Sequence, residues 1–110
     1  MVRTIGIWRI NLAAPWPTDP KQLLGFYDEM WTVMDGLLKK GEFEEFGFFP
    51  DGYTGYVIAK GEAVDAFRNA SMFLPFVITE IHEIIPYEKG KEIVRAVVKA
   101  QIAAMKTMKK

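Results

Sequence analysis

The chain contains no cysteine and only one histidine, His82, among its 110 residues. The absence of cysteine excludes disulfide bonds, thiolate metal sites and a cysteine nucleophile. A single histidine without clustered aspartates leaves too few ligands at usable spacing for a metal site. We therefore predict neither a bound metal nor an organic cofactor.

The sequence also lacks net charge and long apolar runs. Fourteen basic and fourteen acidic residues cancel, so the chain lacks the positive field typical of a nucleic-acid-binding protein. No stretch approaches the roughly 18 apolar residues of a membrane span, and Met1–Thr4 leads into strand-like sequence without the apolar region of a signal peptide. We expect a cytoplasmic protein that binds neither nucleic acid nor membranes.

Apolar residues are abundant by comparison. Half of the chain is hydrophobic. Counted with glycine and without tyrosine, the apolar share is about 55%, against a usual share of about 45–50%. A domain of this size cannot hide all of that surface internally, which indicates a subunit interface, a ligand cavity, or both.

The order of the expected elements predicts the fold class. Alternating and 3.6-residue apolar patterns predict strands at 2–12, 42–49, 53–60 and 76–85, and helices at 20–40, 62–72 and 88–109. The order strand-helix-strand-strand-helix-strand is that of a ferredoxin-like α+β domain. We predict a single domain over 1–110, with a βαββαβ core at 2–87 and an extra C-terminal helix at 88–110.

In that topology the four strands are antiparallel, the first and third are central, and both inner helices lie on one face. The opposite face still carries isoleucines, namely Ile5, Ile7, Ile78 and Ile84. Either the last helix or the sheet of a second subunit must cover them. Two sheets that face each other form a dimeric α/β barrel, so we expect a homodimer or larger homo-oligomer.

A set of motifs after Gly41 carries a family resemblance. They are Gly52-Tyr53-x-x-Tyr56-x-Ile58, Glu62-Ala63-x-x-x-x-Phe67, Leu74-Pro75-Phe76 and Glu80-Ile81. This half of the chain is similar to muconolactone isomerase and its small uncharacterised relatives in the dimeric α/β-barrel superfamily. The resemblance implies obligate oligomers, a cleft between sheet and partner subunit, and a proton shift without a cofactor. Other members of the superfamily use haem, for which His82 would be the axial ligand.

The candidate catalytic residues are Glu80 and His82. They are two residues apart on one strand, so both side chains leave the same face. A carboxylate beside an imidazole favours general acid-base chemistry. Face parity adds Arg9 and Asn11 from the adjacent first strand, and Arg9 would bind a substrate carboxylate. The alternative is an ion-pair network at a subunit interface.

Aromatic residues of the strands provide a second candidate feature. Trp8, Phe46, Phe48, Tyr53 and Tyr56 are expected either to line a pocket for a planar ligand or to form plain core. Tyr53 and Tyr56 are the predicted polar clamp on the substrate. Glu44 and Glu45 are consecutive in a strand, so we expect them to point to opposite faces as edge charges.

Two functions remain open from the sequence. The first is a protein that binds a small apolar or aromatic acid in an inter-subunit cleft and catalyses a cofactor-free isomerisation there. The second is a non-enzymatic assembly or ligand-sensing module. In that case the apolar surplus is interface, and Glu80 and His82 are structural.

Overall fold

The computed structural model describes residues 2–108. Its elements are, in order, β1 (Arg3–Ile10), α1 (Pro20–Lys39), β2 (Phe43–Phe48), β3 (Thr54–Lys60), α2 (Ala63–Ser71), β4 (Val77–Ile84) and α3 (Tyr87–Met108). The predicted strands and helices are all present, and their described ends differ from the prediction by at most two residues. The predicted end of the last helix, at 109–110, lies outside the described residues. None of the helices in this range combines the length and the apolar content that a membrane-spanning helix needs.

The four strands form one antiparallel sheet in the order β2-β3-β1-β4. Strands β1 and β3 are central, as predicted. The structure is α+β, with a four-stranded antiparallel sheet and three helices, which is compatible with the predicted ferredoxin-like fold.

Helix α1 begins at an N-cap residue that is followed by a proline. Asp19 is extended and its carboxylate accepts a hydrogen bond from the Gln22 backbone N–H at 3.1 Å. Pro20 occupies the first helical turn, where a missing N–H costs nothing. The helix ends before Gly41, whose φ of 80° suits a residue without a Cβ.

The β2-β3 hairpin is held by a turn around Asp51. Its carboxylate accepts hydrogen bonds from the Thr54 hydroxyl at 2.7 Å and from the Tyr53 backbone N–H at 2.8 Å. The Thr54 hydrogen bond first, and then the Tyr53 one, lowers the pKa of Asp51 below its ordinary value of 3.8. Gly52 takes the positive φ that closes the turn.

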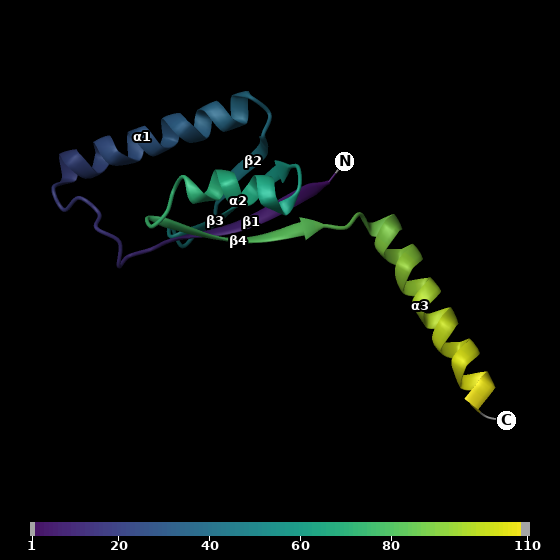
Figure 1. Ribbon diagram of the computed structural model, residues 1–110. Helices are drawn as coiled ribbons and strands as arrows, with labels where there is room; N and C mark the ends of the chain where they lie inside the picture. Colours follow the sequence, from purple (N-terminus) through teal and green to yellow (C-terminus); the bar gives the residue numbers. More distant parts are fainter. Residues whose placement is uncertain (1, 109–110) are drawn as a thin grey trace.

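Helices α1 and α2 lie on the same face of the sheet (Figure 1). We call this side the covered face and the opposite side the free face. On the covered face, Leu37 of α1 packs against Phe43 and Ala59 of the sheet, and these three side chains are the centre of the core. Four partly buried residues surround them, namely Met34, Leu38, Val57 and Phe73.

Helix α3 does not join this core. It leaves the end of β4 and projects away from the sheet (Figure 1), so the described chain extends over 75 × 30 × 24 Å. Of the two covers predicted for the free face, the last helix of the same chain is therefore excluded in this structure. Within residues 2–108 no other element lies over the free face.

Candidate functional site

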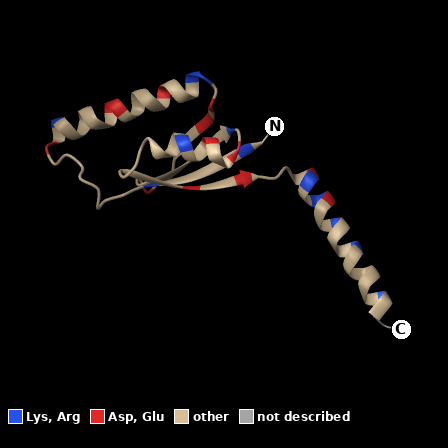
Figure 2. Ribbon diagram, in the orientation of Figure 1, with Lys and Arg blue, Asp and Glu red and all other residues tan. Residues whose placement is uncertain are grey.

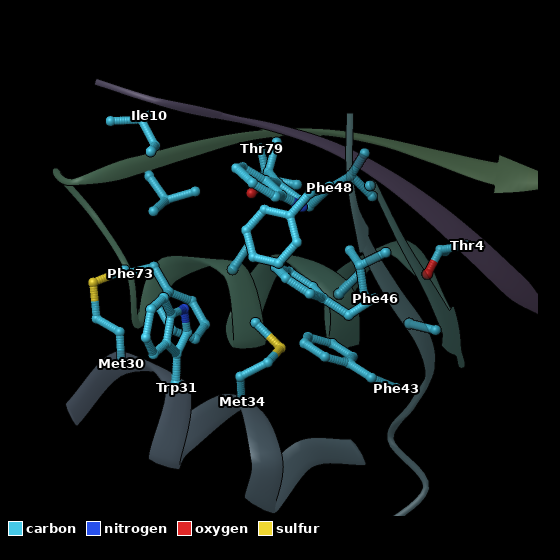
Figure 3. A pocket seen from close by; sticks show the side chains of 18 of the residues that line it. Thr4, Ile10, Met30, Trp31, Met34, Phe43, Phe46, Phe48, Phe73 and Thr79 are labelled. Carbon is cyan, nitrogen blue, oxygen red and sulfur yellow. The ribbon is translucent and has the colours of Figure 1, made fainter. Parts of the chain in front are cut away.

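An apolar cavity of about 210 Å³ lies between the covered face and helices α1 and α2. Its floor comes from alternate residues of β1, namely Thr4, Gly6, Trp8 and Ile10, and of β4, namely Val77, Thr79 and Ile81. Figure 3 shows Met30, Trp31 and Met34 of α1 forming the wall opposite the sheet, with Phe43, Phe46 and Phe48 beside them. The alternation of β1 thus sends one set of side chains into the cavity and the other to the free face.

Gly6, in the floor of the cavity, allows the side chains of the two neighbouring strands to approach β1 closely. A Cβ at Gly6 would lie 2.8 Å from both Thr79 Cγ2 and Val57 Cγ1. The neighbouring strands therefore pack their side chains where the Gly6 side chain would be. A substitution at Gly6 would force Thr79 into the cavity or distort the sheet.

Aromatic rings form the densest part of the cavity wall. The Trp8 indole stacks on Phe46 with ring centroids 5.3 Å apart and an interplanar angle of 1°, and it meets Phe48 edge-on at 5.4 Å. The indole lies against Gly55. Only a glycine fits there, because a Cβ would collide with the ring. This arrangement gives the cavity a flat aromatic surface.

Two polar atoms in the cavity wall are buried without a partner. Thr4 is 1% exposed and Trp8 is 5% exposed. Within residues 2–108, neither Thr4 Oγ1 nor Trp8 Nε1 has a hydrogen-bond partner. An unpaired buried polar atom costs about 1–3 kcal/mol, so both atoms leave hydrogen-bonding capacity unused beside the cavity.

Trp16 anchors the segment that precedes α1. Its indole N–H donates a hydrogen bond to the Asn11 carbonyl at 2.7 Å, and its ring stacks on Tyr27 and meets Phe76 edge-on. The Asn11 amide donates to the Pro75 carbonyl at 3.0 Å. Asn11, which was predicted by face parity to join Arg9 with Glu80 and His82, lies just beyond the end of β1, and its side chain connects two loops.

The predicted catalytic residues lie on the free face. Across the β1-β4 ladder, Ile5 is opposite His82 and Ile7 is opposite Glu80. Glu80 Oε2 lies 3.0 Å from His82 Nε2, and the two side chains are 71% and 59% exposed. The structure thus brings this pair together, but outside the cavity.

Arg9 is on the same face as this pair. It lines a shallow groove together with Glu80, Ile7 and Ile78. Because these groups are open to solvent in the protomer, they form a charged surface, and any enclosed site there needs a second molecule on top.

The two tyrosines predicted as a polar clamp are separated from the cavity. Tyr53 is 57% exposed at the hairpin turn. Tyr56 is opposite Ile7 and so faces the free side, where it stacks on Phe49 with centroids 5.9 Å apart. The neighbouring Glu45 carboxylate raises the pKa of the Tyr56 hydroxyl, chiefly through a hydrogen bond. The predicted aromatic pocket is therefore divided: Trp8, Phe46 and Phe48 line the cavity, whereas the tyrosines do not.

Strand β2 corrects the expectation for Glu44 and Glu45. The ladder has a register shift between Phe43 and Glu45, and such a bulge places an extra residue on one strand. Glu45 is opposite Ile58, and Glu44 Oε2 lies 2.6 Å from Arg3 Nη2. Both carboxylates therefore lie on the free face, and the two side chains do not point to opposite faces as expected.

Sequence reasoning missed the helical wall of the cavity. Met30 and Met34 lie at a helical spacing that is equally typical of plain core, and Thr4 and Thr79 carry no signal apart from strand parity. A stripe of flexible methionines opposite a strand with a glycine was the available clue. Across residues 2–108, no three His, Asp or Glu side chains gather closely enough to hold a metal ion.

Neither the family models nor the curated proteins compared with this chain match it.

Proposed function

We propose that this protein binds a small, flat, largely apolar molecule in the cavity between the sheet and helices α1 and α2. The observation that carries the proposal is the combination of an apolar, aromatic-walled cavity with two buried polar atoms that lack partners. Ligand sites in proteins have this character, mostly apolar with a few oriented polar groups.

The size of the cavity limits the ligand. Apolar cavities of about 150 Å³ accept benzene, and this one has about 210 Å³. A molecule with one or two fused rings matches that volume, and the flat face made by Trp8 and Phe46 offers it a stacking surface.

The polarity of the wall limits the ligand further. Among the described residues that line the cavity there is no Asp, Glu, His, Lys or Arg. An ionised group would be costly there. A neutral ligand with one carbonyl, ether or hydroxyl oxygen would instead accept a hydrogen bond from Trp8 Nε1 or Thr4 Oγ1 after a small movement of these side chains.

The free face supports a homodimer in the same proposal. Its isoleucines are only half-buried in the protomer, and the sheet of a second copy would complete their burial. Two such sheets form the dimeric α/β barrel that the family resemblance implies. Sheets pack face to face at about 10 Å, which leaves each cavity on the outer side of its own sheet.

The free face also favours a second candidate function, which is the cofactor-free proton shift of a muconolactone-isomerase-like enzyme. The 3.0 Å contact between Glu80 and His82, with Arg9 in the adjoining groove, is the specific observation for it. In a barrel these residues would lie in the inter-subunit cleft. Arg9 would hold the carboxylate of a small acid, and Glu80 or His82 would move the proton.

Calorimetric titration with indole tests the cavity proposal. We expect indole to bind the full-length protein, and Ala66→Phe, which fills the cavity from α2, to weaken binding at least about tenfold because the ring occupies ligand space. Val64→Phe is the matched control, because Val64 is on the same helix but 58% exposed; its affinity should equal that of wild type.

Undiminished binding by Ala66→Phe would contradict the proposal, as would the absence of binding to the wild type. If Ala66→Phe does not fold, Ala70→Leu makes a smaller change in the same wall and should weaken indole binding in the same direction.

A further inference from the structure

Helix α3 is a long amphipathic helix that projects away from all other elements of the described residues (Figure 1). Of its 22 residues, all are exposed except Gly90, which is half-buried. Its apolar residues form one broad stripe that includes Val94 (61% exposed), Val98 (45%), Ile102 (50%) and Met105 (57%). Most of the stability of a helix in a protein comes from packing of such a face, so this stripe requires a surface to pack against.

The charge of this segment differs from that of the rest of the chain. Residues 87–110 contain seven basic and two acidic residues, a net charge of +5, whereas residues 1–86 contain seven basic and twelve acidic residues, a net charge of −5. Figure 2 shows basic positions along α3 as far as its last turns, with acidic positions only near its start. The charge asymmetry favours contact between α3 and the body of another copy of the same chain.

Helix α1 offers a surface that matches this stripe. Leu24 is 58% exposed and Trp31 is 44% exposed, and their spacing of seven residues places them on one edge of the helix. Asp28 and Asp35 have the same spacing and flank that edge. Neither carboxylate makes an ion pair with any residue of the described range.

The basic residues of α3 repeat that spacing. Lys99 and Lys106 are seven residues apart and flank the stripe formed by Val98, Ile102 and Met105. They too make no ion pair within 2–108. Seven residues span about 10.5 Å along either helix, so two acid-base pairs can form at once when the helices lie side by side. At about 30 and 33 Å, α1 and α3 are also well matched in length.

We propose that α3 is an exchanged arm, which packs its apolar stripe along the Leu24–Trp31 edge of α1 in a second copy of this chain. Asp28 and Asp35 of that copy pair with Lys99 and Lys106 of the arm. The exchange is reciprocal in a two-fold dimer. Trp31 also lines the cavity, so the arm of one copy shields the cavity mouth of the other. This inference goes beyond ligand binding and does not depend on it.

Charge reversal in the full-length chain tests the arm. Lys99→Glu/Lys106→Glu should weaken self-association about tenfold in sedimentation equilibrium, since two attractions become repulsions. Asp28→Lys/Asp35→Lys should do the same, and the variant with all four changes should recover wild-type association. Glu29→Lys is the control, because its side chain is about 100° around the helix from Asp28 and should leave association unchanged.

A cysteine cross-link supplies a second readout, which the cysteine-free chain makes unambiguous. When Asp35→Cys protein is mixed with Lys99→Cys or with Lys106→Cys protein, one of the two mixtures should form an inter-chain disulfide under mild oxidation. A monomer of 12.6 kDa, unaltered association after charge reversal, or no rescue by the fourfold variant would each overturn the proposal. If the charge reversals leave dimerisation unchanged, the dimer assembles through the sheets and not through the arm.

Discussion

The two faces of the sheet are built from the same strands but differ in chemistry. On the covered face, β1 contributes Thr4, Gly6 and Trp8 to an apolar cavity without a charged wall residue in the described range. On the free face, the same strand contributes Ile7 and Arg9 to a surface that also holds Glu80 and His82. Alternation along a strand thus keeps an apolar site and a charged surface apart by the thickness of one sheet.

Burial determines how strongly the polar groups of each face favour a bound partner. On the covered face, a polar atom without a partner costs free energy, so Thr4 and Trp8 favour a ligand that satisfies them. On the free face, solvent already satisfies the charged pair, and an exposed ion pair contributes about 0–1 kcal/mol. The charged groups of the free face therefore contribute more to binding or stability only when a second subunit excludes water from them.

The largest expected effect is a loss of stability from a substitution that disrupts packing on the covered face. In Gly55→Ala, the new Cβ would collide with the Gly47 carbonyl oxygen and the Trp8 ring. Because a backbone atom cannot move aside cheaply, we expect a loss of about 3 kcal/mol or more in the free energy of unfolding, measured by urea denaturation. Gly25→Ala is the control: nothing lies within 4 Å of its Cβ, and it should stabilise α1 by about 0.5–1 kcal/mol. Equal effects of the two variants would contradict the packing described for Trp8.

A smaller effect on stability is expected from the free face. Glu80→Gln and His82→Ala should each change the free energy of unfolding by less than about 1 kcal/mol, since both side chains are exposed. If the face is a cleft for a small acid, benzoate binding followed by NMR should be lost in Arg9→Met and weakened in both other variants. Unchanged benzoate binding, together with a weaker oligomer, would assign Glu80 and His82 to an interface.

The smallest expected effect concerns the turn that sets the β2-β3 register and so decides which residues reach the cavity. The pKa of Asp51 is lowered in the folded protein, so its carboxylate stabilises the fold above the ordinary value of 3.8. That contribution disappears as the pH falls through the lowered value. In thermal melts below pH 4, Asp51→Asn should therefore lose less stability than wild type. The same acid sensitivity in both proteins would argue against the Thr54 and Tyr53 hydrogen bonds.

The sequence predicts those features of the fold for which the apolar pattern is compatible with a single structure. It predicts the strand order and the shared face of Arg9, Glu80 and His82, because the first follows from the order of the elements and the second from parity. It did not predict the bulge at Glu44, since an added residue leaves no trace in an alternating pattern.

The position of two aromatic groups also escaped the sequence. Tyr56 and Phe46 belong to neighbouring strands, and only the register of the ladder puts them on opposite faces. The course of α3 was equally hidden, because an amphipathic helix is compatible with packing on its own sheet or on another chain. Tertiary contacts decide such cases, and a single sequence does not record them.

The most direct test of the cavity as the ligand site of a dimeric protein is native mass spectrometry of wild-type protein and Ala66→Phe after incubation with indole. We predict a dimer, with a mass of twice 12.6 kDa, for both proteins and bound indole only for wild type. Indole retained by Ala66→Phe, or a monomer in both samples, would contradict the account.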